Sequence, residues 1–253
     1  MEGPLPGCRE TSAPPSTCPR PTLPLNRFWI ESAPMNSYRY ALFDLDGTLI
    51  DSFQALTTAV NRTASEIGHP SLTLEQVRAI VGEGVERLLQ KAFHSDRIPP
   101  ETIASFERHY DEVCCEESRI LAEVEQTLAW MKESRIRMAV CTNKLTSFSI
   151  KILEHLGLSH YFEAVVGPDS AGARKPDRRH VLFTLERIGA RPDETLFIGD
   201  MPIDVEAARN ASLDVAVIAT GSSSTETLRA SSPDHLLERF SDLRSLFALA
   251  EVC

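Results

Sequence analysis

The chain has 253 residues, of which 42% are hydrophobic and 25% are charged, and its formal net charge at pH 7 is −10. These proportions are typical of a globular protein. The negative charge argues against non-specific nucleic-acid binding, which needs a basic face, and no apolar run approaches the roughly 18 residues of a membrane-spanning helix. A small anionic substrate remains compatible, because local cations can hold a phosphate on an acidic protein.

The six cysteines are scattered along the chain without the spacing of a metal site or a disulfide framework. They are Cys8, Cys18, Cys114, Cys115, Cys141 and Cys253. Reduced thiols, and hence a cytoplasmic protein, are the simpler expectation.

Residues 1–37 differ in composition from the rest of the chain, because they hold eight of its 16 prolines. Such a segment is expected to be a disordered or loosely extended tail. Met35 directly precedes the folded pattern, so it is either the functional start or an internal residue behind a genuine extension.

A short apolar run, Tyr40–Phe43, ends in Asp44-Leu45-Asp46-Gly47-Thr48. Side chains alternate along a strand, so Asp44 and Asp46 are expected on the same side. Two such carboxylates repel each other unless a cation is present, and the Gly-Thr pair allows a sharp turn that brings backbone N–H groups close to a bound group. The segment predicts a site for Mg²⁺ and phosphate with a carboxylate nucleophile; an ordinary Asp/Gly turn is the alternative.

Between Phe53 and Thr127 the pattern predicts helices and no strand. The helical runs are Leu56–Ile67, Leu74–Val81, Val85–Phe93 and Thr102–Cys115. We interpret 53–127 as an all-helical cap inserted into a core made of residues 38–52 and 128–253. The cap would cover the ends of the core strands and exclude water.

The remainder of the core alternates between strand-like and helical runs. The strand-like runs are Met138–Thr142, Ala164–Val166, Leu196–Ile198 and Val215–Ala219, and the helical runs include Thr146–Leu156, Asp177–Ile188 and Ile203–Asn210. Short apolar strands separated by helices predict an α/β fold with a Rossmann-like, doubly wound parallel sheet. Ligands bind beyond the carboxyl ends of such strands, which is where Asp44, Thr142 and Asp200 fall.

Three further motifs follow DLDGT in a recognisable order: CTN at 141–143, RKPD at 174–177 and GDMPID at 199–204. With these four motifs, the chain from about Tyr38 onward resembles the haloacid-dehalogenase-like phosphohydrolases. Residues 43–52, 81–87 and 233–236 most resemble the phosphoglycolate-phosphatase-like branch of that family.

The resemblance implies that Asp44 is the nucleophile and that Asp46 is the general acid and base. It also implies a metal site made by Asp44, the backbone carbonyl of Asp46, Asp200 and Asp204. Mg²⁺ suits this set, because it keeps several waters and needs few protein carboxylates. A helix N-terminal turn of acidic residues is the alternative for Asp200 and Asp204.

The resemblance further implies that Thr142, Asn143 and Lys175 bind the phosphoryl group. A helix N-terminal turn is the alternative for Thr142 and Asn143. For Lys175 the alternative is a solvated surface lysine, and its neighbour Arg174 is expected at the surface.

The cap is expected to select the substrate through the segment that contains Gly82, Glu83, Gly84 and Arg87. The two glycines allow a tight loop close to the active site, and Arg87 is suited to bind a substrate carboxylate in bidentate fashion. A solvated Arg87 on a surface helix is the alternative.

The second Asp of the first motif favours phosphate-ester hydrolysis within the family, because relatives that cleave other bonds usually lack it. The expected function is therefore that of a Mg²⁺-dependent phosphatase of a small phosphorylated metabolite, with 2-phosphoglycolate as the first candidate. Pyrophosphate, nucleotide and sugar-phosphate hydrolysis, or a phosphomutase, are alternatives, as is a non-catalytic binding or regulatory protein on this fold. A monomer or a homodimer is expected, with no nucleic-acid or membrane partner.

Overall fold

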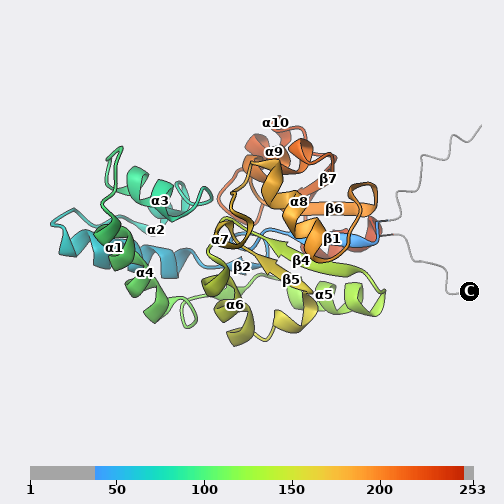
Figure 1. Ribbon diagram of the computed structural model, residues 1–253, viewed down its shortest axis with the longest axis horizontal. Coiled ribbons are helices and arrows are strands. Elements are labelled where there is room, and N and C mark those ends of the chain that lie inside the picture. Colours follow the sequence, from blue (N-terminus) through green and yellow to red (C-terminus); the bar gives the residue numbers. More distant parts are fainter. Residues whose placement is uncertain (1–37, 248–253) are drawn as a thin grey trace, which may run out of the picture. The chain divides into compact units, whose positions relative to one another are not determined.

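The computed structural model describes residues 38–247 (Figure 1). The predicted tail at 1–37 and the last six residues of the predicted core lie outside the described residues. Within 38–247, no helix combines the length and the apolar character that crossing a bilayer would require.

A six-stranded, fully parallel sheet forms the core, in the order β5-β4-β1-β6-β7-β8. Its strands are β1 (Tyr40–Phe43), β4 (Arg137–Cys141), β5 (Ala164–Val166), β6 (Thr195–Gly199), β7 (Asp214–Ile218) and β8 (His235–Leu237). The five predicted strands are confirmed, each to within one residue at either end. Only the edge strand β8 was not predicted, because its three residues are half-buried and carry no distinct pattern.

Helices cover both faces of this sheet, as the doubly wound class requires (Figure 1). They are α5 (Val124–Glu133), α6 (Thr146–His155), α7 (Pro168–Ala171), α8 (Arg178–Arg187), α9 (Pro202–Asn210) and α10 (Thr225–Ala230), with three short 3₁₀ turns, η1 (Ser159–Tyr161), η2 (Pro192–Glu194) and η3 (Phe240–Ser245). Side chains alternate along each strand. Ala41 and Phe43 therefore pack in the cluster that includes α5 and α6, while Leu42 packs in the cluster that includes α8 and α9.

Four helices form the insert between β1 and β4: α1 (Phe53–Glu66), α2 (Leu74–Arg78), α3 (Val85–Ala92) and α4 (Pro100–Val113). The chain enters the insert through β2 (Ile50–Asp51) and leaves it through β3 (Arg119–Ile120), and these two strands pair antiparallel. The expectation of no strand in 53–127 was therefore wrong for β3, since two residues are too few to show a period. The predicted end of the cap at residue 127 falls inside α5.

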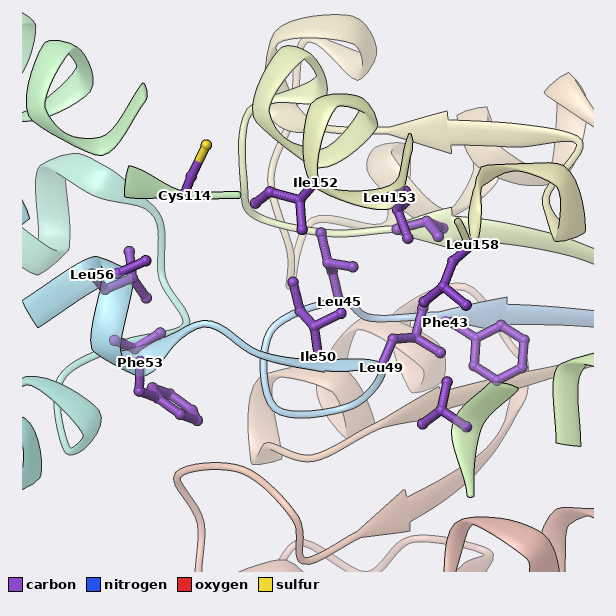
Figure 2. Close-up of a cluster of buried hydrophobic side chains, with 14 of the residues drawn as sticks. Phe43, Leu45, Leu49, Ile50, Phe53, Leu56, Cys114, Ile152, Leu153 and Leu158 are labelled. Atoms are coloured by element: carbon purple, nitrogen blue, oxygen red, sulfur yellow. The ribbon is translucent and has the colours of Figure 1, made fainter. Parts of the chain in front are cut away.

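Buried apolar side chains continue from the core into the insert (Figure 2). Phe43 at the end of β1, Leu45 in the following turn, Ile50 in β2, and Phe53 and Leu56 at the start of α1 belong to one cluster. Each fully buried side chain of this size contributes roughly 1.5–3 kcal/mol. The segment that carries Asp44 and Asp46 is thus anchored by packing on both sides.

A buried histidine on α8 makes the stability of the fold depend on pH. The Nε2 of His180 lies 3.2 Å from the Val166 carbonyl oxygen, which can only accept, so Nε2 carries the proton. Nδ1 is buried and has no hydrogen-bond partner within the described residues. Burial, followed by the nearby Lys175, lowers the pKa of His180 from 6.5 to about 4.

Because the folded state holds this proton less tightly than the unfolded state, the free energy of unfolding should fall as pH drops from 6.5 towards 4. The loss is about 1.4 kcal/mol per pH unit. In His180→Gln the amide can still donate to Val166. Between pH 7 and 5, the free energy of unfolding of this variant should fall by about 2 kcal/mol less than that of the wild type. Urea unfolding of both proteins at both pH values measures this difference, and equal losses would contradict it.

Candidate active site

Three buried carboxylates meet at the carboxyl edge of the sheet. Asp44 directly follows β1, Asp200 directly follows β6, and Asp204 lies in the first turn of α9. One oxygen of each lies within 4.8 Å of the others, an arrangement that can hold a metal ion. β1 and β6 are neighbours in the sheet, and the Asp44 N–H donates to the Ile198 carbonyl at 2.9 Å, so backbone pairing sets this proximity.

The surroundings of Asp200 orient its carboxylate. Thr48 Oγ1 donates to Oδ1 at 3.1 Å, and the Ser222 N–H donates to Oδ2 at 3.3 Å. Gly47 has φ of +85°, and a Cβ placed there would lie 2.5 Å from Asp200 Oδ2. Only glycine fits both this backbone conformation and this space, which explains the Gly-Thr pair after the two aspartates.

Lys175 joins two of the carboxylates. Its Nζ lies 2.7 Å from Asp44 Oδ1 and 2.7 Å from Asp204 Oδ1, and the residue is 2% exposed. Burial acts to lower the pKa of Lys175, but Asp204 and Asp44 raise it above its ordinary value, so the ammonium stays charged. Asp204 Oδ2 also accepts from the backbone N–H groups of Asp200 and Met201, which fixes the turn before α9.

The charge at this edge fits a divalent cation. When all three are ionised, Asp44, Asp200 and Asp204 would supply three negative charges against one positive charge on Lys175, an excess of two negative charges in a buried space. Burial, then the neighbouring carboxylates Asp204 and Asp44, raises the pKa of Asp200 well above its usual range. Burial also raises the pKa of Asp204 to about 6, although Lys175 opposes it. A bound divalent ion would offset this repulsion, so the donors present fit such an ion.

Thr142 and Asn143 follow β4, the other neighbour of β1 in the sheet. The Thr142 hydroxyl oxygen accepts from the Lys144 N–H at 3.2 Å, which leaves the hydroxyl proton for another partner. The Asn143 side chain is occupied within the protein: it donates to the Gly82 and Lys175 carbonyls and accepts from the Lys175 N–H at 2.8 Å. Asn143 therefore ties the strand end to Lys175 and to the insert.

Asp46 is held by side chains that the sequence did not single out. Ser52 Oγ donates to Oδ1, and Lys144 Nζ lies 2.7 Å from Oδ2. Lys144 Nζ also donates to the Tyr110 hydroxyl on α4 at 2.8 Å. Position alone suggests Lys144, because it directly follows the CTN motif, whereas nothing in the sequence connects Tyr110 to this site.

A pocket of about 110 Å³ lies between Asp44, Asp46 and the insert. Gly82 and Gly84, with φ of +122° and +92°, line it, and a side chain at Gly82 would require the end of the Met201 side chain, next to Asp200, to move. The other lining side chains include Thr142, Asn143, Lys144, Glu107, Tyr110, Phe106, Phe148 and Arg174. Burial raises the pKa of Glu107, the acidic group that the insert contributes.

The two arginines near this pocket differ in position. Arg174, expected at the surface, is largely exposed but lines the pocket, and its Nη1 lies 3.4 Å from the Glu83 carbonyl. Among residues 38–247, no carboxylate pairs with Arg174. Arg87 is exposed, donates to Gln90 at 2.9 Å, and lines a neighbouring surface hollow with Glu83, Glu86 and Arg174. The structure thus brings the predicted core residues together but places Arg87 outside the pocket that contains Asp44.

Comparisons with known proteins identify the family to which the chain belongs. Residues 41–218 match the family model described as haloacid dehalogenase-like hydrolase. The chain is 38% identical over 208 residues to a phosphoglycolate phosphatase of Aquifex aeolicus, covering 82% of this chain and 96% of that protein. It is 34% identical over 221 residues to one of Photobacterium profundum, covering 84% and 96%.

A solved structure has the same fold. The crystal structure of a predicted phosphoglycolate phosphatase from Haemophilus somnus superimposes with a TM-score of 0.76 at 27% identity, covering 83% of this chain and 98% of that one. With the matched family model, these likenesses establish that the chain belongs to the haloacid dehalogenase-like hydrolases and is a phosphatase.

Proposed function

We propose that the protein hydrolyses phosphomonoesters through an aspartyl-phosphate on Asp44, with Mg²⁺ at the Asp44, Asp200 and Asp204 cluster. The observation that carries the proposal is the position of Asp44. Its carboxylate lines the pocket, pairs with Lys175 at 2.7 Å and lies beside Asp200. A nucleophile needs this combination of access to the substrate and nearby positive charge.

Asp44 attacks phosphorus, and the bond from phosphorus to the leaving oxygen breaks. Asp46, also on the pocket wall, donates its proton to that oxygen, so that the product leaves as an alcohol. Asp46 is then ionised and removes a proton from the water that attacks the aspartyl-phosphate, which releases inorganic phosphate and restores Asp44. Asp44, Asp200, Asp204 and the Asp46 carbonyl would hold Mg²⁺, which when bound offsets the charge of the phosphoryl oxygens.

Three groups near Asp44 are proposed to bind the phosphoryl oxygens. The Thr142 hydroxyl keeps its proton for this purpose, and the Asn143 backbone N–H complements it, since the Asn143 side chain is already engaged. Lys175, held between Asp44 and Asp204, supplies the positive charge. Charge-assisted donors that are fixed before the substrate arrives are the main way such sites lower the barrier.

We further propose 2-phosphoglycolate as the substrate. The curated relatives that carry this name support it, and so does Arg174, a guanidinium at the pocket that can meet a carboxylate and offset Glu107. The loop of Gly82, Glu83 and Gly84 is the proposed specificity segment. Arg87, at the neighbouring hollow, is the other candidate for carboxylate binding.

Release of inorganic phosphate from a panel of phosphorylated metabolites tests the substrate directly. The panel should contain 2-phosphoglycolate, a nucleoside monophosphate, a sugar phosphate and pyrophosphate. We expect the highest kcat/KM for 2-phosphoglycolate. A higher value for another member would replace this substrate without affecting the phosphatase activity.

Removing divalent cations should silence the enzyme. After EDTA treatment we expect no measurable turnover of p-nitrophenyl phosphate, because the net charge left by Asp44, Asp200 and Asp204 is then uncompensated. Mg²⁺ should restore activity and Ca²⁺ should inhibit it, since Ca²⁺ is larger and prefers more oxygen ligands. Full activity in a metal-free sample would refute the metal role of Asp200.

A further inference from the structure

Both oxygens of the Asp46 carboxylate are contacted by side chains outside the four sequence motifs. Ser52 contacts one oxygen, and Lys144, which directly follows the CTN motif, contacts the other. We propose that Lys144 is a positioning residue that holds Asp46 in the orientation for proton transfer, and that Tyr110 of the insert completes this contact. The inference rests on the proposed function, because it assigns Lys144 a role that acts only through Asp46.

Lys144 makes a short, largely buried contact with Asp46, and an ammonium can donate to an oxygen of the carboxyl group whether that group is ionised or protonated. Its Nζ lies 2.7 Å from Asp46 Oδ2, and the two side chains are 6% and 14% exposed. Ser52 Oγ donates to the other oxygen of Asp46. Each carboxylate oxygen can accept more than one hydrogen bond, so both stay available to the pocket while the plane of the carboxylate is set.

Tyr110 links this contact between Lys144 and Asp46 to the insert. Its hydroxyl accepts from Lys144 Nζ at 2.8 Å, and the same Nζ lies 4.7 Å from the centre of the Tyr110 ring. The ring is buried and packs edge-on against Phe148 at 5.2 Å and stacked with Phe106 at 5.7 Å. Tyr110 is therefore held rigidly by both the insert and the core helix α6. Lys144 is in this way fixed between a core carboxylate and an insert hydroxyl.

A positioning role is physically reasonable because proton transfer depends steeply on geometry. A displacement of about 1 Å in a reacting group costs on the order of a hundredfold in rate. The terminal torsion of an Asp side chain is soft, so contacts on both oxygens restrict it. Lysine suits the task, since its three ammonium donors can serve Asp46 and Tyr110 together.

Two aryl substrates of nearly the same shape, p-nitrophenyl phosphate and phenyl phosphate, show whether Lys144 positions Asp46 or binds the phosphoryl group directly. p-Nitrophenolate leaves as a stable anion, whereas the leaving group of phenyl phosphate depends more on a proton from Asp46. Asp46→Asn should raise the ratio of kcat/KM for p-nitrophenyl phosphate to kcat/KM for phenyl phosphate at least tenfold. General acid catalysis typically contributes about 10²–10⁴-fold to the rate, and phenyl phosphate should lose more of this contribution than p-nitrophenyl phosphate. Lys144→Met should raise the same ratio, and the double variant should match Asp46→Asn alone.

Tyr110→Phe keeps the ring packing and removes only the hydroxyl. It should move the ratio in the same direction by a smaller factor, about threefold to tenfold, and it keeps the proposal testable if Lys144→Met does not fold. The matched control is Lys151→Met. Lys151 lies on α6 and reaches α4, as Lys144 does from the turn before α6, and it pairs there with Asp111 at 2.6 Å, but both side chains are about half exposed. In Lys151→Met the ratio of kcat/KM for the two substrates should stay within about twofold of the wild-type ratio.

The outcomes are distinct. If Asp46→Asn shifts the ratio but Lys144→Met lowers turnover of both substrates equally, Lys144 binds the phosphoryl group and the inference is overturned. The same holds if Lys144→Met keeps its full effect in the Asp46→Asn background. If Asp46→Asn leaves the ratio unchanged, the proposed acid role of Asp46 fails, and the inference fails with it.

Discussion

Asp44→Asn is expected to reduce kcat by several orders of magnitude while the protein stays folded. Asn has nearly the same shape but no charged oxygen, so no acyl-phosphate can form at this position. Nucleophile removal in hydrolases costs factors of this size. Lys175 keeps its pairing with Asp204 at 2.7 Å, so the variant does not leave a buried ammonium without a partner.

Phosphate release from p-nitrophenyl phosphate, with a thermal unfolding curve for the same preparation, measures both parts of this expectation. Because one factor of ten corresponds to about 1.4 kcal/mol in the barrier, retention of more than a tenth of wild-type kcat is incompatible with a nucleophile. Asp51→Asn is a suitable control. It changes an aspartate in β2 that is absent from the pocket lining, and its turnover should stay close to wild type.

Arg174→Ala should lower kcat/KM for 2-phosphoglycolate by about a hundredfold and leave p-nitrophenyl phosphate nearly unchanged. The guanidinium lines the pocket without a carboxylate partner among the described residues, so a substrate carboxylate would be its counterion. Truncating one member of such a pair costs on the order of 2–5 kcal/mol when the pair is buried. Arg174 is largely exposed, so no more than the lower end of that range is expected for its contact with a substrate carboxylate.

Arg87→Ala is the matched variant, because Arg87 lies near the same loop but lines the neighbouring hollow. It should change neither substrate by more than about threefold. A large loss on 2-phosphoglycolate in Arg87→Ala, with none in Arg174→Ala, would show that Arg87 meets the carboxylate when substrate is bound. Equal losses on both substrates in Arg174→Ala would indicate a structural role, since Arg174 also contacts the Glu83 carbonyl.

The parallel sheet was predictable from the sequence because each interior strand is a short apolar run buried on both faces. Tyr40–Phe43 was predicted to the residue, and so was Ala164–Val166, although that strand is at the edge of the sheet and only partly buried. The meeting of Asp44, Thr142 and Asp200 at one edge was predictable for a related reason: each directly follows a strand, and parallel neighbours end at the same edge.

The tertiary structure alone decided the pairing of β2 with β3, because strands of two residues carry no period and their partners lie about 70 residues apart. It also decided that Arg174 rather than Arg87 lines the pocket, and that Lys144 lies between Asp46 and Tyr110. Local sequence patterns record which residues form a strand and where the strand ends. Contacts between the insert and the core depend on how two separately packed groups of helices meet, and no short-range pattern in the chain records that.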